Sequence, residues 1–273
     1  MQKTILITGS TDGIGLVTAE MLVAQGHRVL LHGRSVARLE TAKKSLSEIP
    51  GGGSVDSFLA DLSRLEDVEA MAKAVLERYD RLDVLINNAG VFHTPETIAP
   101  NGIDVRFVVN TLAPYLLTQR LMPLLGSGAR VVNLSSAAQS PVDLEALDGQ
   151  LHPTDDFKAY AQSKLAITMW SRHMAQTLGA DGPMIVAVNP GSMLGSKMVK
   201  EGFGVDGGDI RIGADILVRA ALSDEFENAS GLYFDNDSGD FAEPHQDALD
   251  ERKPVEIVAA IEKVLASTGY FLP

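Results

Sequence analysis

The sequence predicts an α/β fold in which a doubly wound parallel sheet of about seven strands is flanked by helices in three layers. Short β-branched or leucine-rich runs alternate with longer amphipathic stretches along the chain, and Gly, Asn, Asp or Pro bounds each run. This alternation is typical of repeated strand-helix units. No internal repeat and no linker divides the 273 residues, so we expect one domain over residues 1–273.

The predicted strands are apolar runs that end at turn-forming residues. The first contains Thr4-Ile5-Leu6-Ile7 and stops before a glycine-rich segment, and the fifth contains Val131-Val132-Asn133-Leu134. Such runs of four to eight apolar residues are typical of strands buried in a parallel sheet. The full set of expected strands is 3–8, 27–32, 54–60, 82–87, 129–135, 183–189 and 231–234.

The segments between the strands carry helical patterns. Helices are expected near 13–25, 35–48, 64–79, 102–124, 156–178, 212–222 and 254–268. The last follows Pro254, a residue that fits the first turn of a helix. Gly51-Gly52-Gly53 is too short for an interdomain tether. The long glycine-rich stretch 192–211 has no helical pattern, and we expect an irregular lid there.

Composition excludes several classes of function. The formal net charge of −13 argues against nucleic acid or anionic membrane as a partner, because both need clustered Lys and Arg. The chain has no cysteine, which excludes disulfides and thiolate chemistry. No signal-peptide pattern follows Met1, and no apolar run approaches the ~20 residues of a membrane span, so we expect a cytoplasmic protein without a membrane partner.

No metal site is predicted. Asp235-Asn236-Asp237-Ser238-Gly239-Asp240 superficially resembles a calcium loop, but Gln246 stands at the twelfth position, where such loops need a bidentate Glu. The six histidines show no paired ligand spacing.

A glycine cluster follows the first strand and opens the first helix. It has the spacing Gly9-x-x-x-Gly13-x-Gly15. Backbone N–H groups at a helix start can face a pyrophosphate, and missing β-carbons let the phosphates approach. We therefore expect a dinucleotide to bind at Gly9, Ser10, Thr11, Asp12, Gly13, Ile14 and Gly15.

Tyr160 and Lys164 lie four residues apart in the predicted helix 156–178, so they share one face. An ammonium group beside a phenol favours phenolate, which predicts that the pKa of Tyr160 is lowered toward working pH, where it can give or take a proton. Because the pair lies downstream of the strand-like run that ends at Ser136 and of the glycine cluster, the arrangement indicates hydride-transfer chemistry, although a Tyr-x-x-x-Lys pair alone would carry little information.

Together with Asn87-Asn88-Ala89-Gly90, Asn110 and Ser136, these motifs resemble those of the short-chain dehydrogenase/reductase family, in order and spacing from residue 3 to Asn189-Pro190-Gly191. The resemblance implies a Rossmann-type sheet, a nicotinamide dinucleotide and a catalytic tetrad of Asn110, Ser136, Tyr160 and Lys164. In that tetrad Ser136 would bind the substrate oxygen, Tyr160 would exchange its proton, Lys164 would also hold the ribose, and Asn110 would hold a water. Ser135 is expected to have a structural part.

The same resemblance implies further cofactor contacts. They are Arg34, Asp61, Leu62, Asn88, Ala89, Gly90, Tyr160, Lys164, Pro190, Gly191 and Ser192. Asp61 is expected beside the adenine, or alternatively as a cap of the next helix. Gly33 stands where an acid would select NAD, and Arg34 can pair with a 2′-phosphate, so NADP(H) is favoured over NAD(H).

The lid is expected to supply an apolar lining from Met193, Met198 and Phe203. The expected substrate is a small molecule with an aldehyde or ketone on an apolar body. The long tract between Ser136 and Tyr160 is expected to form an extra loop. With Leu112–Thr118, it is similar to the family branch that includes retinol dehydrogenases and protochlorophyllide reductases. Relatives often pair through the helices near 102–124 and 156–178, which implies a homo-oligomer.

The sequence therefore predicts an NADP(H)-dependent alcohol/carbonyl oxidoreductase. The alternative is a regulatory protein on the same fold that senses NADP without turnover. The presence of both Tyr160 and Lys164 favours the enzyme, because a sensor needs neither.

Overall fold

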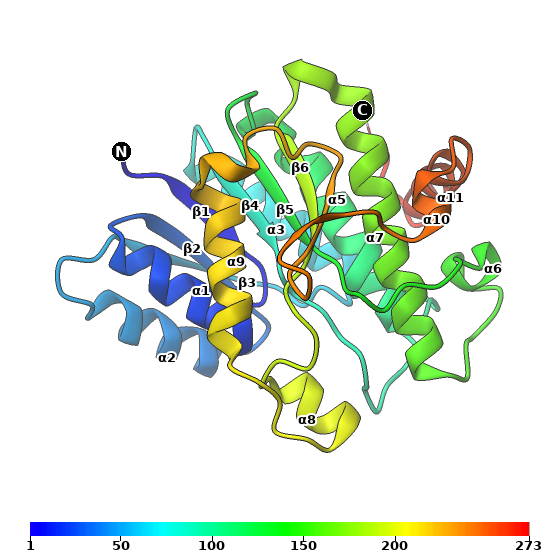
Figure 1. Ribbon diagram of the computed structural model, residues 1–273, viewed down its shortest axis with the longest axis horizontal. Helices are drawn as coiled ribbons and strands as arrows, with labels where there is room; N and C mark the ends of the chain where they lie inside the picture. The colour runs from blue at the N-terminus through cyan, green and yellow to red at the C-terminus, as the bar shows by residue number, and fades with distance from the viewer. Residues whose placement is uncertain (273) are drawn as a thin grey trace.

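The computed structural model describes residues 1–272, apart from the side chain of Phe203, and this part of the chain forms an eight-stranded sheet with helices on both faces (Figure 1). The strand order is β3-β2-β1-β4-β5-β6-β7-β8. Neighbours from β3 to β7 run parallel, and β8 is antiparallel to β7. The strands are β1 Thr4–Ile7, β2 Arg28–Gly33, β3 Val55–Leu59, β4 Val84–Asn87, β5 Arg130–Leu134, β6 Met184–Asn189, β7 Tyr233–Asp235 and β8 Asp240–Ala242.

Helices cover the two faces of the sheet. One face carries α1 Gly13–Ala24, α2 Val36–Ser47 and α9 Ile210–Leu222, and the other carries α3 Leu65–Arg78, α5 Ala113–Leu121 and α7 Asp156–Leu178 (Figure 1). The shorter or peripheral elements are α4 Val105–Phe107, η1 Val108–Leu112, η2 Met122–Leu124, α6 Leu144–Leu147, η3 Gly179–Asp181, α8 Lys197–Phe203, η4 Asp224–Phe226, α10 Gln246–Leu249 and α11 Lys253–Ser267.

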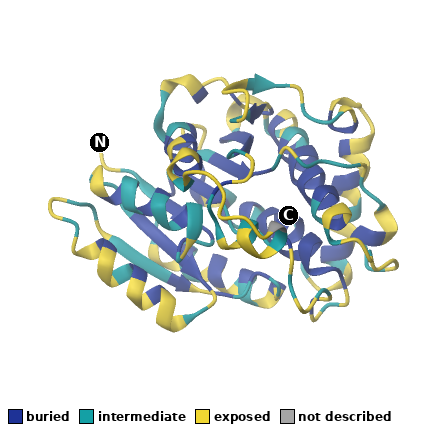
Figure 2. Cartoon of the chain, turned by 60° about the horizontal axis from the view of Figure 1, so that its bottom comes forward, coloured by how far each residue is buried: buried dark blue, intermediate teal, exposed yellow. Residues whose placement is uncertain are grey.

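Strand alternation separates two apolar cores. Ile5 and Ile7 of β1 pack with α1, α2 and α9, whereas Leu6 points to the opposite core with α3, α5 and α7. All three side chains are fully buried, because both faces of a parallel sheet are covered. Figure 2 shows the same pattern, with buried strands inside and exposed residues on the outer sides of the helices.

The strand order reverses between β1 and β4, because the chain crosses back over β1 after β3. At such a reversal the connecting segments diverge and leave a crevice at the carboxyl ends of the strands. The segments that follow β1 and β4 meet there. The amide Nδ2 of Asn88 donates to the carbonyl oxygens of Thr8 (2.8 Å) and Gly9 (3.0 Å).

The predicted fold class is confirmed, with three differences in detail. The sequence missed β8, because its three residues at the sheet edge carry no apolar run. The helix expected from 102 begins at Val105, since Gly102 has φ +82°, and it is divided by the π-helical turn η1. The expected irregular lid 192–211 was wrong in part, because it contains α8, which Ser196 caps by accepting from the N–H of Val199.

The C-terminal helix α11 packs against α7. Tyr115 of α5 donates its hydroxyl to Glu262 of α11 at 2.7 Å, and the Tyr115 ring meets Trp170 of α7 edge to face at 5.5 Å. Part of the helical surface expected to pair two subunits is therefore covered by the chain itself.

A buried ion pair fixes the start of α7. Arg106 and Asp104 are fully buried, and the guanidinium donates to both Asp104 oxygens (2.8 and 2.5 Å). Arg106 also bonds to Asp156 in the first turn of α7, four residues before Tyr160. That hydrogen bond holds the pKa of Asp156 below its usual value.

We expect Arg106→Leu to lower the free energy of unfolding by about 3–5 kcal/mol, because the Asp104 carboxylate would remain buried without its partner. Urea denaturation of the purified protein measures this loss. The matched control is Arg81→Leu, since Arg81 pairs with Asp83 at 2.8 Å on the surface and is 70% exposed. The control should cost no more than about 1 kcal/mol. A loss for Arg106→Leu as small as the control's would contradict the assigned role.

Candidate active site

Two glycines of the loop between β1 and α1 are packed too closely for a side chain. Gly9 has φ +65°, and a β-carbon there would lie 2.9 Å from the Cα of Ala89. A β-carbon on Gly15 would lie 2.4 Å from Asn88 Nδ2. Gly13, with φ +59°, instead faces open space, where a β-carbon would meet only Ile210 at 4.0 Å. The loop therefore presents bare backbone to the crevice, which fits a phosphate group.

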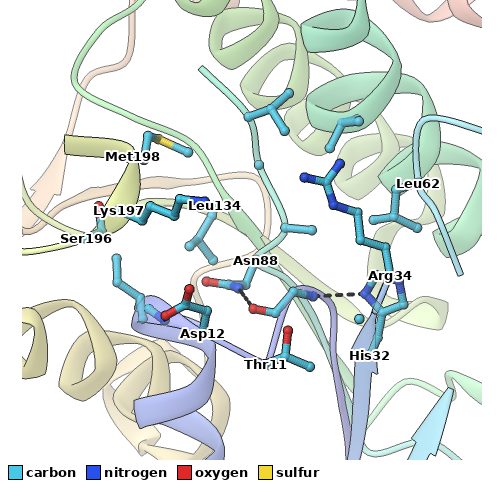
Figure 3. Close-up of a pocket in the computed structure, with 18 of the residues that line it drawn as sticks. Thr11, Asp12, His32, Arg34, Leu62, Asn88, Leu134, Ser196, Lys197 and Met198 are labelled. Carbon is cyan, nitrogen blue, oxygen red and sulfur yellow. Dashed lines mark hydrogen bonds between the residues drawn. The ribbon is translucent and has the colours of Figure 1, made fainter. Parts of the chain in front are cut away.

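His32, the fifth residue of β2, holds this loop in place through a hydrogen bond. The backbone N–H of Gly9 donates to His32 Nδ1 at 2.9 Å (Figure 3). His32 Nε2 lies 3.1 Å from the carbonyl oxygen of Ala60. These two bonds require a neutral imidazole with its proton on Nε2. Burial lowers the pKa of His32 to about 4, so the ring is neutral at physiological pH.

A cavity of about 440 Å³ opens above the loop at the carboxyl edge of the sheet. In Figure 3, Arg34 and Lys197 lie on opposite sides of it. Of the predicted cofactor residues it is lined by Gly9, Thr11, Asp12, Gly13, Ile14, Arg34, Asp61, Leu62, Asn88, Ala89, Gly90, Tyr160, Lys164 and Pro190.

Four predicted cofactor residues do not line this cavity, and one of them, Gly15, packs against Asn88 instead. Ser10 is buried, and its hydroxyl donates to the carbonyl of Ile7 at 2.9 Å, so it supports the loop from inside. Gly191 and Ser192 line a second cavity. Asp61 lines the first cavity while its carboxylate accepts from the N–H and hydroxyl of Ser63 (3.0 and 2.8 Å), which makes it a turn residue as well.

The predicted tetrad converges at the end of β5. Tyr160 hydrogen-bonds to Ser136, and Lys164 Nζ lies 5.6 Å from the centre of the Tyr160 ring. The Lys164 ammonium donates to the carbonyl oxygen of Leu134 at 2.8 Å. Ser135 faces α7 instead, with its hydroxyl 2.6 Å from that of Thr168, as expected for a structural part.

Asn110 lies in the π-helical turn η1, a distortion that is common at functional sites. Its amide donates to the carbonyl of Val91 and to the Ser163 hydroxyl, both at 2.9 Å, and its oxygen accepts from Val91 N at 2.8 Å. The side chain thus ties the segment after β4 to α7. The water expected at Asn110 stays a prediction.

The predicted direction of the Tyr160 pKa shift was wrong. Burial raises the pKa of the phenol, and the hydrogen bond to Ser136 only opposes that rise. The ammonium predicted to lower it is itself removed from water, and burial lowers the pKa of Lys164 to about 8. Both shifts have the same cause, because desolvation disfavours the charged form of each group.

A second cavity of about 320 Å³ adjoins the first, and Tyr160 lines both. Its floor includes Ser136, Pro190, Gly191 and Ser192. Its walls are largely apolar, as the lid prediction required for Met193 and Met198, whereas the side chain of Phe203 lies outside the described part of the structure. The apolar lining consists of Ile14, Phe92, Phe157, Met193, Leu194, Met198 and Val199.

Of the lining residues that sequence reasoning missed, five carry a charge or an aromatic ring. Arg38 follows Arg34 by four residues, a spacing that could have indicated a second cation. Phe157 precedes Tyr160 by three residues on α7, a signal equally visible in the sequence. No local pattern pointed to the others, which are His32, Phe92 and Lys197.

The reversed sheet, the glycine loop and the cavity above it define a Rossmann-type α/β protein with a site that fits a dinucleotide. The sequence profile described as short chain dehydrogenase matches residues 3–203, so the chain belongs to the short-chain dehydrogenase/reductase family. It is thus an oxidoreductase of that family, and a nicotinamide cofactor fits its cavity.

Individual relatives agree with this assignment. Mouse retinol dehydrogenase 13 is 31% identical over 251 residues, which cover 85% of this chain and 75% of that protein. Bovine dehydrogenase/reductase SDR family member 13 is 35% identical, over 86% of this chain and 66% of that protein.

Solved structures show the same fold. An uncharacterized protein from Mycobacterium paratuberculosis has a TM-score of 0.81 at 26% identity, over 100% of this chain and 95% of that one. The landomycin C-6 ketoreductase LanV, solved with NADP and rabelomycin, has a TM-score of 0.67 at 27% identity, over 87% of this chain and 95% of that one.

Among the described residues, no helix combines the length and apolar character that a membrane crossing requires. Within residues 1–272, no group of three or more His, Asp or Glu side chains is arranged to hold a metal ion.

His32 should make the stability depend on pH below neutrality. Its pKa is about 4 in the folded protein against 6.5 for an ordinary histidine, so the unfolded chain takes up the proton first as the pH falls. This contribution to stability is complete above pH 6.5 and is lost between pH 6.5 and 4. Between pH 7 and pH 5 we expect wild type to lose about 2 kcal/mol more than His32→Gln in urea denaturation. Equal losses in both proteins would contradict the role of His32.

Proposed function

We propose that the protein is an NADP(H)-dependent oxidoreductase that interconverts an alcohol and a ketone or aldehyde, with Tyr160 as the general acid and base. The observation that carries this proposal is the position of Tyr160, which lines both cavities and is hydrogen-bonded to Ser136. A carbonyl oxygen in the apolar cavity could meet both hydroxyls, while its carbon faces the neighbouring cofactor cavity.

The bound nicotinamide would supply or accept the hydride. Ser136 would donate a hydrogen bond to the carbonyl oxygen, and Tyr160 would pass its proton to that oxygen as negative charge develops on it. A phenol whose pKa burial raises stays protonated, which suits donation in the direction of reduction. Lys164 would stabilise the phenolate left behind, because burial leaves its ammonium charge poorly screened.

The cations at the end of β2 support NADP(H) over NAD(H). Arg34 and Arg38 both line the cofactor cavity, together with Ser35. Gly33 leaves no acid to repel a 2′-phosphate, and a β-carbon there would lie 2.6 Å from Thr11 Cγ2. Asp12 offsets part of this attraction, since it forms a 3.4 Å ion pair with Arg38.

The lining of the second cavity supports an apolar substrate. Phe92 packs edge to face against both Tyr160 (5.2 Å between ring centres) and Phe157 (6.4 Å), which forms an aromatic wall beside the phenol. The names of similar proteins, retinol dehydrogenase 13 and the landomycin C-6 ketoreductase, point to the same chemical class. The cytoplasmic location stays a prediction.

We expect Tyr160→Phe to lower kcat for carbonyl reduction at least about 100-fold, because the proton donor is lost. The Kd for NADPH should change less than about threefold, since ring contacts remain. Loss of NADPH absorbance with a panel of aldehydes and ketones measures turnover, and fluorescence titration measures binding. Tyr79→Phe is the matched control, because the Tyr79 hydroxyl bonds Asp56 away from both cavities.

Two outcomes would separate the alternatives. A wild-type protein that binds NADPH but reduces none of the carbonyls would favour the NADP sensor. Activity confined to small charged substrates would contradict the apolar site.

Arg34→Gln should raise the Kd for NADPH about tenfold or more and leave the Kd for NADH nearly unchanged, because a charge-assisted hydrogen bond contributes about 1.5–3 kcal/mol. Calorimetric titration with both nucleotides measures the difference. Arg64→Gln is the control, since Arg64 pairs with Glu66 on the surface of the protein. An equal loss for both nucleotides would overturn the assignment of Arg34 to the 2′-phosphate.

A further inference from the structure

The turn between β7 and β8 forms several hydrogen bonds with the segment that follows β6. Asn189 Nδ2 donates to Asp235 Oδ1 at 2.7 Å and to Asp237 Oδ2 at 2.9 Å. The backbone N–H of Ser192 donates to Asp237 Oδ1 at 2.7 Å, and the Ser192 hydroxyl donates to Asp237 Oδ2. Asn236 Nδ2 donates to the Pro190 carbonyl at 3.0 Å. The stretch that superficially resembled a calcium loop therefore uses its carboxylates to hold the chain itself.

This segment, residues 190–192, forms part of the proposed reaction site. Pro190 lines both cavities, and Gly191 and Ser192 line the smaller one together with Ser136 and Tyr160. A shift of this segment would change the distance between the floor of the substrate cavity and the two hydroxyls.

The next residue shows that the segment is held under strain. Met193 has φ +54°, the left-handed region that non-glycine residues rarely adopt, and it is the one such residue among those described. Its carbonyl accepts from the N–H of Gly208 at 2.8 Å, and Leu194 and Gly208 form a parallel bridge. Asp237 on one side and Gly208 on the other thus fix the point where the lid leaves the sheet.

The carboxylate at position 237 suits this task because both of its oxygens accept hydrogen bonds. Burial acts to raise its pKa, but the bonds from Ser192 and Asn189 hold the pKa of Asp237 below its usual value. Charge-assisted bonds of this kind are shorter and stronger than neutral ones.

We propose that Asp237 is a positioning residue that, through Asn189 and Ser192, sets residues 190–193 against Ser136 and Tyr160 and so controls turnover without touching the substrate. This inference rests on the proposed carbonyl chemistry of the same site.

Asp237→Asn tests it with little change in volume. The new amide would place a donor against the donors of Ser192 or Asn189, which frees the segment. We expect kcat for carbonyl reduction to fall about tenfold or more, with the Kd for NADPH within about twofold of wild type. Asp240→Asn is the matched control, since Asp240 is exposed on the same hairpin and accepts from Phe241 N at 2.7 Å. The control should match wild type.

A double-mutant cycle separates positioning from general destabilisation. Ser192→Ala removes the same contact from the other side, so Ser192→Ala/Asp237→Asn should lose no more kcat than the worse single variant. Wild-type kcat for Asp237→Asn, additive losses, or a parallel loss of NADPH affinity would each overturn the proposal.

Hydrogen exchange provides a readout that does not depend on turnover. Backbone amides of residues 191–196 should exchange faster in Asp237→Asn than in wild type, while those of β5 and α7 should not change. If wild type reduces no carbonyl, the proposed function fails, and the exchange result still decides whether Asp237 holds this segment. Unchanged exchange would overturn the positioning role.

Discussion

The hydrogen bond from the Lys164 ammonium to the carbonyl oxygen of Leu134 joins the helix of Tyr160 and Lys164 to the sheet. It connects α7 to the last residue of β5, and Tyr160 and Ser136 extend from these two elements, one turn before Lys164 and two residues after Leu134. Lys164 is 4% exposed, so a cation stands in the interior with one donor satisfied by a neutral carbonyl. Such a group is costly to bury, and hydroxyls of a bound ribose would accept from its remaining donors. Lys164 therefore holds α7 against β5 and leaves ammonium donors that a bound ribose would satisfy.

A set of buried hydrogen bonds connects the strands β4 and β5 to the helices α5 and α7. Asn87 of β4 donates to Asn133 of β5 at 2.8 Å and to Thr118 of α5 at 3.1 Å. Asn133 in turn donates to Ser171 of α7 at 2.8 Å. Amides of two central strands thereby hold α5 and α7, two of the three helices that cover one face, and a buried polar group of this kind is costly to leave unpaired. The pair Asn87-Asn88 has divided roles, because Asn87 links strands to helices while Asn88 holds the glycine loop.

The parts of the fold that follow a simple local pattern could be predicted from the sequence. Strands such as Thr4–Ile7 are continuous apolar runs, and α7 has a capping Asp155 and a long helical pattern, so their places could be predicted. The glycine loop and Ser136 could be expected at the site because they follow predicted strands, and Tyr160 and Lys164 because they lie one turn apart on a predicted helix. What could not be predicted depends on contacts between distant segments. The pKa of Tyr160 is set by burial rather than by its helical neighbour, and the role of Asp237 arises only when β7 pairs beside β6. The helix α8 was missed because glycines surround it and its seven residues show no clear period.

The chain has a net charge of −13, but the charges around the cofactor cavity favour binding of a negatively charged dinucleotide. Arg34, Arg38, Lys164 and Lys197 line the cofactor cavity, whereas Asp12 and Asp61 are the acids along it. Local cations outweigh the overall charge because exposed charges beyond about 10 Å are screened by salt, whereas those within the cavity are not. Lys197 stands on the lid helix α8, opposite Arg34, and pairs with Glu201 at 3.4 Å (Figure 3). A dinucleotide with phosphates between these two walls would attract the lid as well as the end of β2.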